Sequence, residues 1–282
     1  MNSSKKDVYD TIQARQQKLA NKIKLNKFKK DLAAGVKLYQ KKLEDLASEE
    51  IPTPKVRQQI QSDYEYQLTR RQRKLSLARE PSEADMEERY RIRKTYHKVI
   101  KDNIPEETSL CFHGVKDITV LEDILSSGRL GYLDDEQSNS LTAPGSVDVT
   151  TRGCFSKSLG FMGLEATNLE AFLPAGCFFA IVPKDEQEKQ DLIEMPEACI
   201  KSVYFKENPD RIFAIVSTTE NVGYIKKLLH ENNLDSISAY SFDEFAFHIA
   251  KDRLMPNTKA EEKTVKTPLN PALIMQKQDL GK

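Results

Sequence analysis

The first hundred residues place apolar side chains at steps of three and four, which is the spacing of one face of an α-helix. The stretch from residue 6 to residue 48 contains no proline, and its stripe consists of Leu25, Phe28, Leu32, Val36, Tyr39, Leu43 and Leu46. A second stripe follows at Val56, Ile60, Tyr64, Leu68, Leu75 and Ala78. Pro52 and Pro54 lie between the stripes and remove backbone donors there, so the pattern predicts two helices separated by a break.

A third helix is predicted after Pro81, which ends the second one. Ser82 and Asp85 have the spacing of a capping box, in which each side chain accepts a hydrogen bond from the backbone of the other residue. The sequence therefore predicts a helix over residues 83–102. Because the apolar stripes are narrow and the connections are short, residues 1–103 are expected to form a helical hairpin or a small bundle.

Short apolar runs typical of β-strands begin after residue 104 and alternate with helical patterns. The predicted strands cover residues 109–113, 147–151, 177–182, 200–205 and 211–217, and the predicted helices cover 118–127, 219–233 and 242–254. The predicted fold class is therefore α+β, with a basic N-terminal helical hairpin or bundle followed by a mixed α/β domain at residues 104–255. Residues 131–145 are rich in turn formers and predict a long loop, and the polar residues 256–282 predict a flexible tail.

The charge distribution divides the chain in the same place. The net charge of the whole chain is zero, but residues 1–105 contain 25 basic and 15 acidic side chains, a net charge of +10. Residues 106–282 contain 18 basic and 28 acidic side chains, a net charge of −10. The basic region is expected either to dock on the acidic remainder or to bind an anionic partner. The charge count leaves a protein, a phosphate group, a nucleic acid and a lipid surface open as that partner.

The sequence also bears on the compartment. No apolar run reaches the roughly 18–20 residues of a membrane-spanning helix, so no transmembrane segment is predicted. The first residues lack the apolar core of a secretory signal. The four cysteines are far apart and three of them lie in apolar segments, which predicts buried free thiols and a cytoplasmic, reducing location. The last residues, with Leu280 and an acidic pair at Glu261-Glu262, resemble the export tails of bacterial type IV effectors, which implies delivery into a host cell.

Candidate chemistry begins at His113-Gly114, where a predicted strand ends on a histidine and a helix and a Ser-Ser-Gly turn follow. This order resembles the first motif of the His-type ADP-ribosyltransferases, whose His-Gly pair holds the nicotinamide ribose of NAD. Phe155-Ser156-Lys157-Ser158 is similar to the Phe-Ser-x-Ser strand of the Arg-type branch, in which a serine supports the nicotinamide pocket.

A third piece, from Glu170 to Gly176, is similar to the Glu-x-x-Leu-Pro-x-Gly segment that carries the catalytic glutamate of Arg-type enzymes. Cleavage of the bond to nicotinamide develops positive charge on the ribose, and a carboxylate there can offset that charge and hold the 2′-hydroxyl. The resemblance implies NAD as the cofactor. No metal site is expected, because neither His97 nor His230 forms a set with Cys or Asp at ligand spacing. The resemblance implies catalytic roles for Glu170, His113 and Ser158, and a cofactor-binding role for His113, Gly114 and Ser156, with these side chains meeting at one pocket.

Two other functions stay open at this point. Cys154 lies in a Gly-Cys-Phe-Ser turn and is a candidate thiolate nucleophile of a Cys/His hydrolase, with His113, His230 or His248 as its base. The second open function is that of a non-enzymatic interaction module. Its basic helices would bind an acidic or phosphate-bearing partner, and the α/β domain would be their scaffold.

The sequence further predicts a strand at 211–217 that leads through Thr218 or Thr219 into a helix, and the first turn of this helix could present N–H groups to an anion. The same strand and helix are also typical of an ordinary α/β unit.

Overall fold

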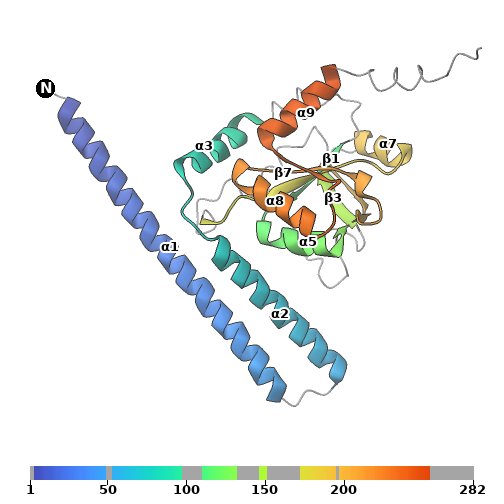
Figure 1. The fold of residues 1–282 in the computed structure, drawn as a ribbon, viewed down its shortest axis with the longest axis horizontal. Helices are drawn as coiled ribbons and strands as arrows, with labels where there is room; N and C mark the ends of the chain where they lie inside the picture. Colours follow the sequence, from blue (N-terminus) through green and yellow to red (C-terminus); the bar gives the residue numbers. More distant parts are fainter. Residues whose placement is uncertain are drawn as a thin grey trace, which may run out of the picture.

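The structure is a computed structural model, and it describes residues 3–48, 53–96, 110–131, 146–150, 172–194 and 197–254. Its architecture is α+β, as predicted: a long helical hairpin and a third helix lie beside a mixed sheet that has helices on both faces (Figure 1). Among the described residues, no helix is long and apolar enough to cross a membrane. The tail at 256–282, with Leu280, and the predicted loop at 132–145 lie outside the described residues.

The hairpin consists of α1 (Ser3–Ser48) and α2 (Pro54–Leu77), which lie side by side over the length of α2 (Figure 1). Tyr39 and Tyr64, one from each predicted stripe, meet edge to face between the two helices with ring centroids 5.9 Å apart. The predicted break is confirmed as well, since Thr53 caps α2 by accepting a hydrogen bond from the backbone N–H of Val56, and Pro54 occupies the first turn.

The third helix, α3 (Glu83–Arg91), begins with the predicted capping box. The Ser82 hydroxyl accepts from the Asp85 N–H at 3.1 Å, and the Asp85 carboxylate accepts from the Ser82 N–H at 2.8 Å. The helix continues as one π-helical turn, η1 (Ile92–Tyr96), and residues 97–102 of the predicted helix lie outside the described residues. Local sequence signals thus fix where α2 and α3 begin.

The main sheet has six strands in the order β5-β3-β1-β4-β7-β8. Their bounds are β1 (Cys111–Val115), β3 (Ser146–Thr150), β4 (Cys177–Ile181), β5 (Glu197–Lys201), β7 (Ile212–Ser217) and β8 (Ser238–Ser241). All neighbours are antiparallel except β7 and β8, which are parallel and joined through a helix. Two shorter strands, β2 (Arg129–Leu130) and β6 (Val203–Tyr204), pair with each other in a second sheet. The strand β1 therefore lies near the middle of the main sheet, between β3 and β4.

Helices cover both faces of the main sheet (Figure 1). They are the 3-10 turn η2 (Ile118–Val120), α5 (Leu121–Ser127), α7 (Glu186–Glu194), the 3-10 turn η5 (Pro209–Arg211), α8 (Thr219–Glu231) and α9 (Phe242–Leu254). The alternation of side chains along β4 separates two apolar cores. Phe179 packs in the core that includes α5 and α8, while Phe178 packs edge to face against Phe242 and Phe245 of α9. Both faces of β4 are buried, which explains its unbroken apolar sequence.

The structure differs from the predicted elements at several positions, and the two-residue strand β2 is among the elements that are not predicted. The predicted strand at 200–205 is two strands, β5 and β6, because the chain leaves the main sheet at Ser202 and pairs with β2 instead. The helix α7 and the strand β8 are not predicted; α7 is highly charged and β8 is only four residues long. The prediction of buried thiols holds for Cys111 and Cys177, is wrong for the exposed Cys199, and is untested for Cys154, which lies outside the described residues.

The basic helices dock on the acidic domain through ion pairs. On α2, Arg70 and Lys74 both contact the Asp117 carboxylate, at 2.8 Å and 2.7 Å, and Arg73 contacts Glu122 and Asp123 on α5.

On α3, Arg89 pairs with Glu220 of α8 at 2.6 Å, and Arg91 pairs with Asp243 of α9 at 2.7 Å. Of the two possibilities that the charge distribution leaves open, docking within the chain is therefore observed for α2 and α3.

Asp117 makes this docking sensitive to acid. Burial alone would raise the pKa of its carboxyl, but hydrogen bonds from Lys74, Thr119 and Arg70 outweigh burial and lower the pKa to about 2. The folded-state pKa lies below the ordinary value of 3.8, so this stabilisation is present above pH 4 and is lost as the pH falls toward 2. We expect Asp117→Asn to lower the free energy of unfolding by about 2 kcal/mol at pH 7.

Urea unfolding at pH 7 and pH 3 measures this effect, and the difference between wild type and Asp117→Asn should shrink at the lower pH. Asp63→Asn is the matched control, because Asp63 is exposed on α2. A deficit of equal size at both pH values would contradict the assigned role of the Asp117 carboxylate.

Candidate functional site

The described residues include two of the predicted site residues, His113 and Gly114, which lie on β1. Ser156, Ser158 and Glu170 lie outside the described residues, as does Cys154. The expected meeting of an imidazole, a hydroxyl and a carboxylate at one pocket therefore stays a prediction.

His113 is half-buried in the middle of the main sheet. It lies directly opposite Phe179 of β4, so its side chain belongs to the face of the sheet that packs against the larger apolar core. Its Nδ1 atom is 2.7 Å from the backbone carbonyl oxygen of Asp148 on the other neighbouring strand, β3. The sheet thus positions the imidazole from both sides.

These contacts define the protonation state of the His113 ring. A carbonyl oxygen only accepts hydrogen bonds, so Nδ1 carries the proton that is donated to Asp148. Burial lowers the pKa of His113, and the nearby Asp148 groups oppose this shift only in part. The ring is therefore neutral at pH 7, and its Nε2 atom has a lone pair that can accept a hydrogen bond from a ligand hydroxyl.

Gly114, the next residue, belongs to the opposite face of the sheet. The antiparallel pairing of Phe112 with Thr150 sets Gly114 beside Asp148, and Asp148 is in turn paired with Cys199 on the edge strand β5. Asp148 and Cys199 are both exposed, and the Cys199 thiol donates to the Asp148 carboxylate at 3.0 Å. The face of the sheet around Gly114 thus carries polar groups at its edge and a residue without a side chain nearer its centre.

The described cysteines do not have the properties of a nucleophile. The hydrogen bond to Asp148 raises the pKa of Cys199 to about 11, and burial raises the pKa of Cys111 to about 12. Burial also raises the pKa of Cys177 far above its ordinary value. All three are thiols at pH 7, whereas nucleophilic attack requires a thiolate. The predicted Cys/His hydrolase therefore depends entirely on Cys154.

The two other candidate bases have structural partners. Nδ1 of His230 lies 3.0 Å from the carboxylate of Asp235, and both side chains are exposed at one end of α8. His248 on α9 is stacked on Tyr240 with ring centroids 4.5 Å apart. Within the described part of the chain, no group of three or more His, Cys, Asp or Glu side chains could hold a metal ion.

The segment at 173–176, which resembles the Leu-Pro-x-Gly motif, has clear structural contacts. The carbonyl of Leu173 accepts a hydrogen bond from Arg89, and the carbonyl of Ala175 accepts one from the Asn221 amide at 2.7 Å. Gly176 precedes β4 and lies against the end of β1, where the carbonyl oxygen of Val115 leaves no room for a Cβ atom. Packing therefore accounts for the glycine of this segment, and its backbone carbonyls have partners within the chain.

The start of α8 does meet anions, as its pattern predicts, but these anions belong to the same chain. The carboxylate of Glu88 on α3 accepts hydrogen bonds from the N–H of Thr219, at 3.0 Å, and from its hydroxyl. Glu220 accepts from Arg79, from Arg89 and from the N–H of Ala175. The N-terminus of α8 is thus a docking point for α3 rather than an open site.

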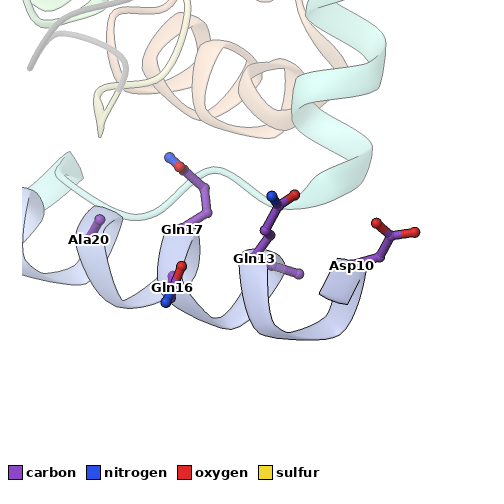
Figure 2. Close-up of a pocket in the computed structure, with 6 residues that line it drawn as sticks. Asp10, Gln13, Gln16, Gln17 and Ala20 are labelled. Atoms are coloured by element: carbon purple, nitrogen blue, oxygen red, sulfur yellow. The ribbon is translucent and has the colours of Figure 1, made fainter. Parts of the chain in front are cut away.

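A surface pocket lies along α1, away from the sheet (Figure 2). Its described lining residues are Asp10, Gln13, Ala14, Gln16, Gln17 and Ala20. Gln13 and Gln17 point toward the connection between α2 and α3 (Figure 2). These lining side chains are amides, one carboxylate and methyl groups, so they offer no histidine or nucleophile for catalysis.

Asp148, Glu88 and Glu220 are not among the residues that the sequence pattern predicts to be important. Asp148 could have been found, because it alternates with Val147 and Val149 and so must lie on the opposite face of its strand. The pairing of Glu220 with Arg89 spans 131 residues and has no local signal.

Comparisons of this chain with protein-family models, curated proteins and solved structures found no match.

Proposed function

We propose that the protein is ADP-ribosyltransferase-like and uses NAD at a site built around His113 on β1. The observation that carries this proposal is the state of the imidazole: Nδ1 is held by the Asp148 carbonyl, and burial favours the neutral ring. Nε2 is then an acceptor for a ribose hydroxyl, which is the role that the His-Gly resemblance implies. The resemblance also assigns Gly114 to the cofactor; because Gly114 belongs to the opposite face of β1, only its backbone could contact a ligand that is bound at the His113 side chain.

The remaining predicted residues have separate roles in this proposal. NAD supplies the reactive bond, which joins nicotinamide to ribose and breaks as an acceptor group bonds to the ribose carbon. Glu170 holds the 2′-hydroxyl and offsets the positive charge that develops on the ribose. Ser158 orients this carboxylate, and Ser156 lines the nicotinamide side.

The substitution His113→Asn tests the assigned role of Nε2. The asparagine amide can still donate to the Asp148 carbonyl, but nothing replaces Nε2, so the sheet contact is kept and the ligand contact is lost. We expect NAD affinity, measured by calorimetric titration, to fall about tenfold. Glu170→Gln is expected to keep NAD affinity and to slow nicotinamide release by at least about 100-fold.

His230→Asn serves as the control, because His230 is exposed and lies on a helix. Thermal unfolding of each variant shows whether the fold is intact. The proposal is wrong if the wild-type protein neither binds NAD nor releases nicotinamide. It is also wrong if His113→Asn binds NAD as tightly as the wild type does.

A second candidate function, binding of an acidic or phosphate-bearing partner by the basic helices, is favoured by a different observation. The ion pairs of α2 and α3 are made within the chain, whereas no ion pair between described residues involves a basic residue of α1. An anionic partner of the basic region would therefore bind α1. This candidate does not depend on the NAD site.

A further inference from the structure

The helix α1 has a second apolar stripe on the side opposite to α2. Ile12, Leu19 and Ile23 are 47%, 61% and 61% exposed, which is unusual for three aliphatic side chains on one helix. Their spacing of seven and four residues places them on one face. The buried face, which includes Leu32 and Leu46, points the other way, toward α2.

Basic side chains lie beside this apolar stripe and beyond its end along the helix. Residues 12–41 contain nine Lys or Arg residues and one Asp, a net charge of +8 in a chain whose total charge is zero. Lys22, Lys27 and Lys30 are exposed beside or beyond the stripe. In the described part of the chain no acidic side chain pairs with them, in contrast to Arg73 and Lys74 of α2.

We infer that α1 binds an anionic lipid surface along this face. A central aliphatic stripe with flanking lysines is the arrangement of helices that lie at a membrane interface, where the aliphatic groups enter the acyl boundary and the lysines reach the headgroups. A nucleic acid would engage the lysines but leave the aliphatic groups without apolar contacts. This inference rests on the second proposed function and names the partner; it is independent of NAD.

The shape of the molecule supports a flat partner. The helix α1 forms an outer edge of the structure, with α2 and the sheet on its other side (Figure 1). It has 46 residues and is therefore about 69 Å long. A planar surface can meet the exposed face over much of this length without displacing α2, so binding requires no opening of the hairpin.

Vesicle co-sedimentation of the full chain tests the inference. We expect binding to vesicles with about 30% phosphatidylserine and little binding to pure phosphatidylcholine. The variant Lys27→Gln/Lys30→Gln should lower the partition coefficient about 30-fold, since each lysine near an anionic surface changes partition about fivefold. The variant Leu19→Gln/Ile23→Gln should lower partition at least about tenfold while leaving the net charge unchanged. Raising the salt concentration should weaken binding of the wild type.

The variant Lys226→Gln/Lys227→Gln is the matched control, because it removes two exposed lysines from α8 instead of α1. It should bind vesicles within about twofold of the wild type. Circular dichroism and thermal unfolding establish that all variants are folded, since every substituted side chain is exposed.

Each other outcome overturns the inference in a distinguishable way. If heparin or polyglutamate binds through α1 but vesicles do not, the partner is an acidic macromolecule: the lipid inference fails and the second proposed function stands. If no anion binds, both fail. If vesicles bind but the α1 and α8 variants lose equal affinity, the binding surface does not lie on α1.

Discussion

Replacing Gly176 with alanine is expected to lower the free energy of unfolding by about 3 kcal/mol, the upper end of what overpacking usually costs. A Cβ atom at this position would overlap the carbonyl oxygen of Val115 and lie 2.8 Å from that of Lys116. Both atoms belong to the backbone and cannot rotate away, so β1 and β4 must separate locally. Urea unfolding followed by circular dichroism measures the loss.

Gly223→Ala is the control for this substitution. Gly223 is exposed on α8, and no atom lies within 4 Å of the position of its Cβ. Alanine there should stabilise the protein by about 1 kcal/mol, because glycine is a poor helix residue. If Gly176→Ala were as stable as the wild type, the close approach of β1 and β4 would not be a real constraint on this sequence.

This glycine also affects how the resemblance is interpreted. The Leu-Pro-x-Gly piece is one of three that suggest NAD chemistry. Its glycine is required because the end of β1 leaves no room for a side chain there, and its backbone carbonyls accept hydrogen bonds from Arg89 and Asn221. A packing requirement can therefore produce this part of the pattern without any catalysis. The NAD proposal therefore rests on His113, whose Nδ1 is held by the Asp148 carbonyl and whose Nε2 is left as an acceptor.

Elements with local signals are predicted well from the sequence. The capping box at Ser82 fixes the start of α3, and the predicted helix at 242–254 has the bounds of α9. Elements whose bounds depend on pairing with distant strands are not predicted well from the sequence. The division of residues 200–205 between β5 and β6 depends on which strands are available for pairing, β3 and β2, and not on the residues themselves.

The same distinction holds for the charges and the site. Counting charges by halves leaves both docking on the acidic remainder and binding of an anionic partner open. It does not show that Asp117 receives Arg70 and Lys74, or that no ion pair between described residues involves a basic side chain of α1. The pattern likewise places His113 on a strand. Its contact with the Asp148 carbonyl depends on β3 lying beside β1, a pairing across 35 residues that alternation alone does not specify.

The second large effect is expected at Glu220, where Glu220→Gln should lower the free energy of unfolding by about 3–5 kcal/mol. The Glu220 and Arg89 side chains are only 4% and 7% exposed, and Arg79 donates to the same carboxylate. Glutamine keeps the size of the side chain but removes its charge, so the two guanidinium groups lose the carboxylate that joins α3 to α8. The glutamate also lies in the first turn of α8, where a negative charge is favourable.

Urea unfolding at pH 7 measures this loss, and Glu231→Gln is the matched control on the same helix, since its pair with Lys227 is exposed and 3.6 Å long. That control should change stability by less than about 1 kcal/mol. Limited proteolysis gives a second readout, because detachment of α3 should expose the connection at residues 78–82 to cleavage before the sheet unfolds. If Glu220→Gln matched Glu231→Gln in both measurements, α3 would be held by its other contacts, and the docking of the basic region would not depend on this buried carboxylate.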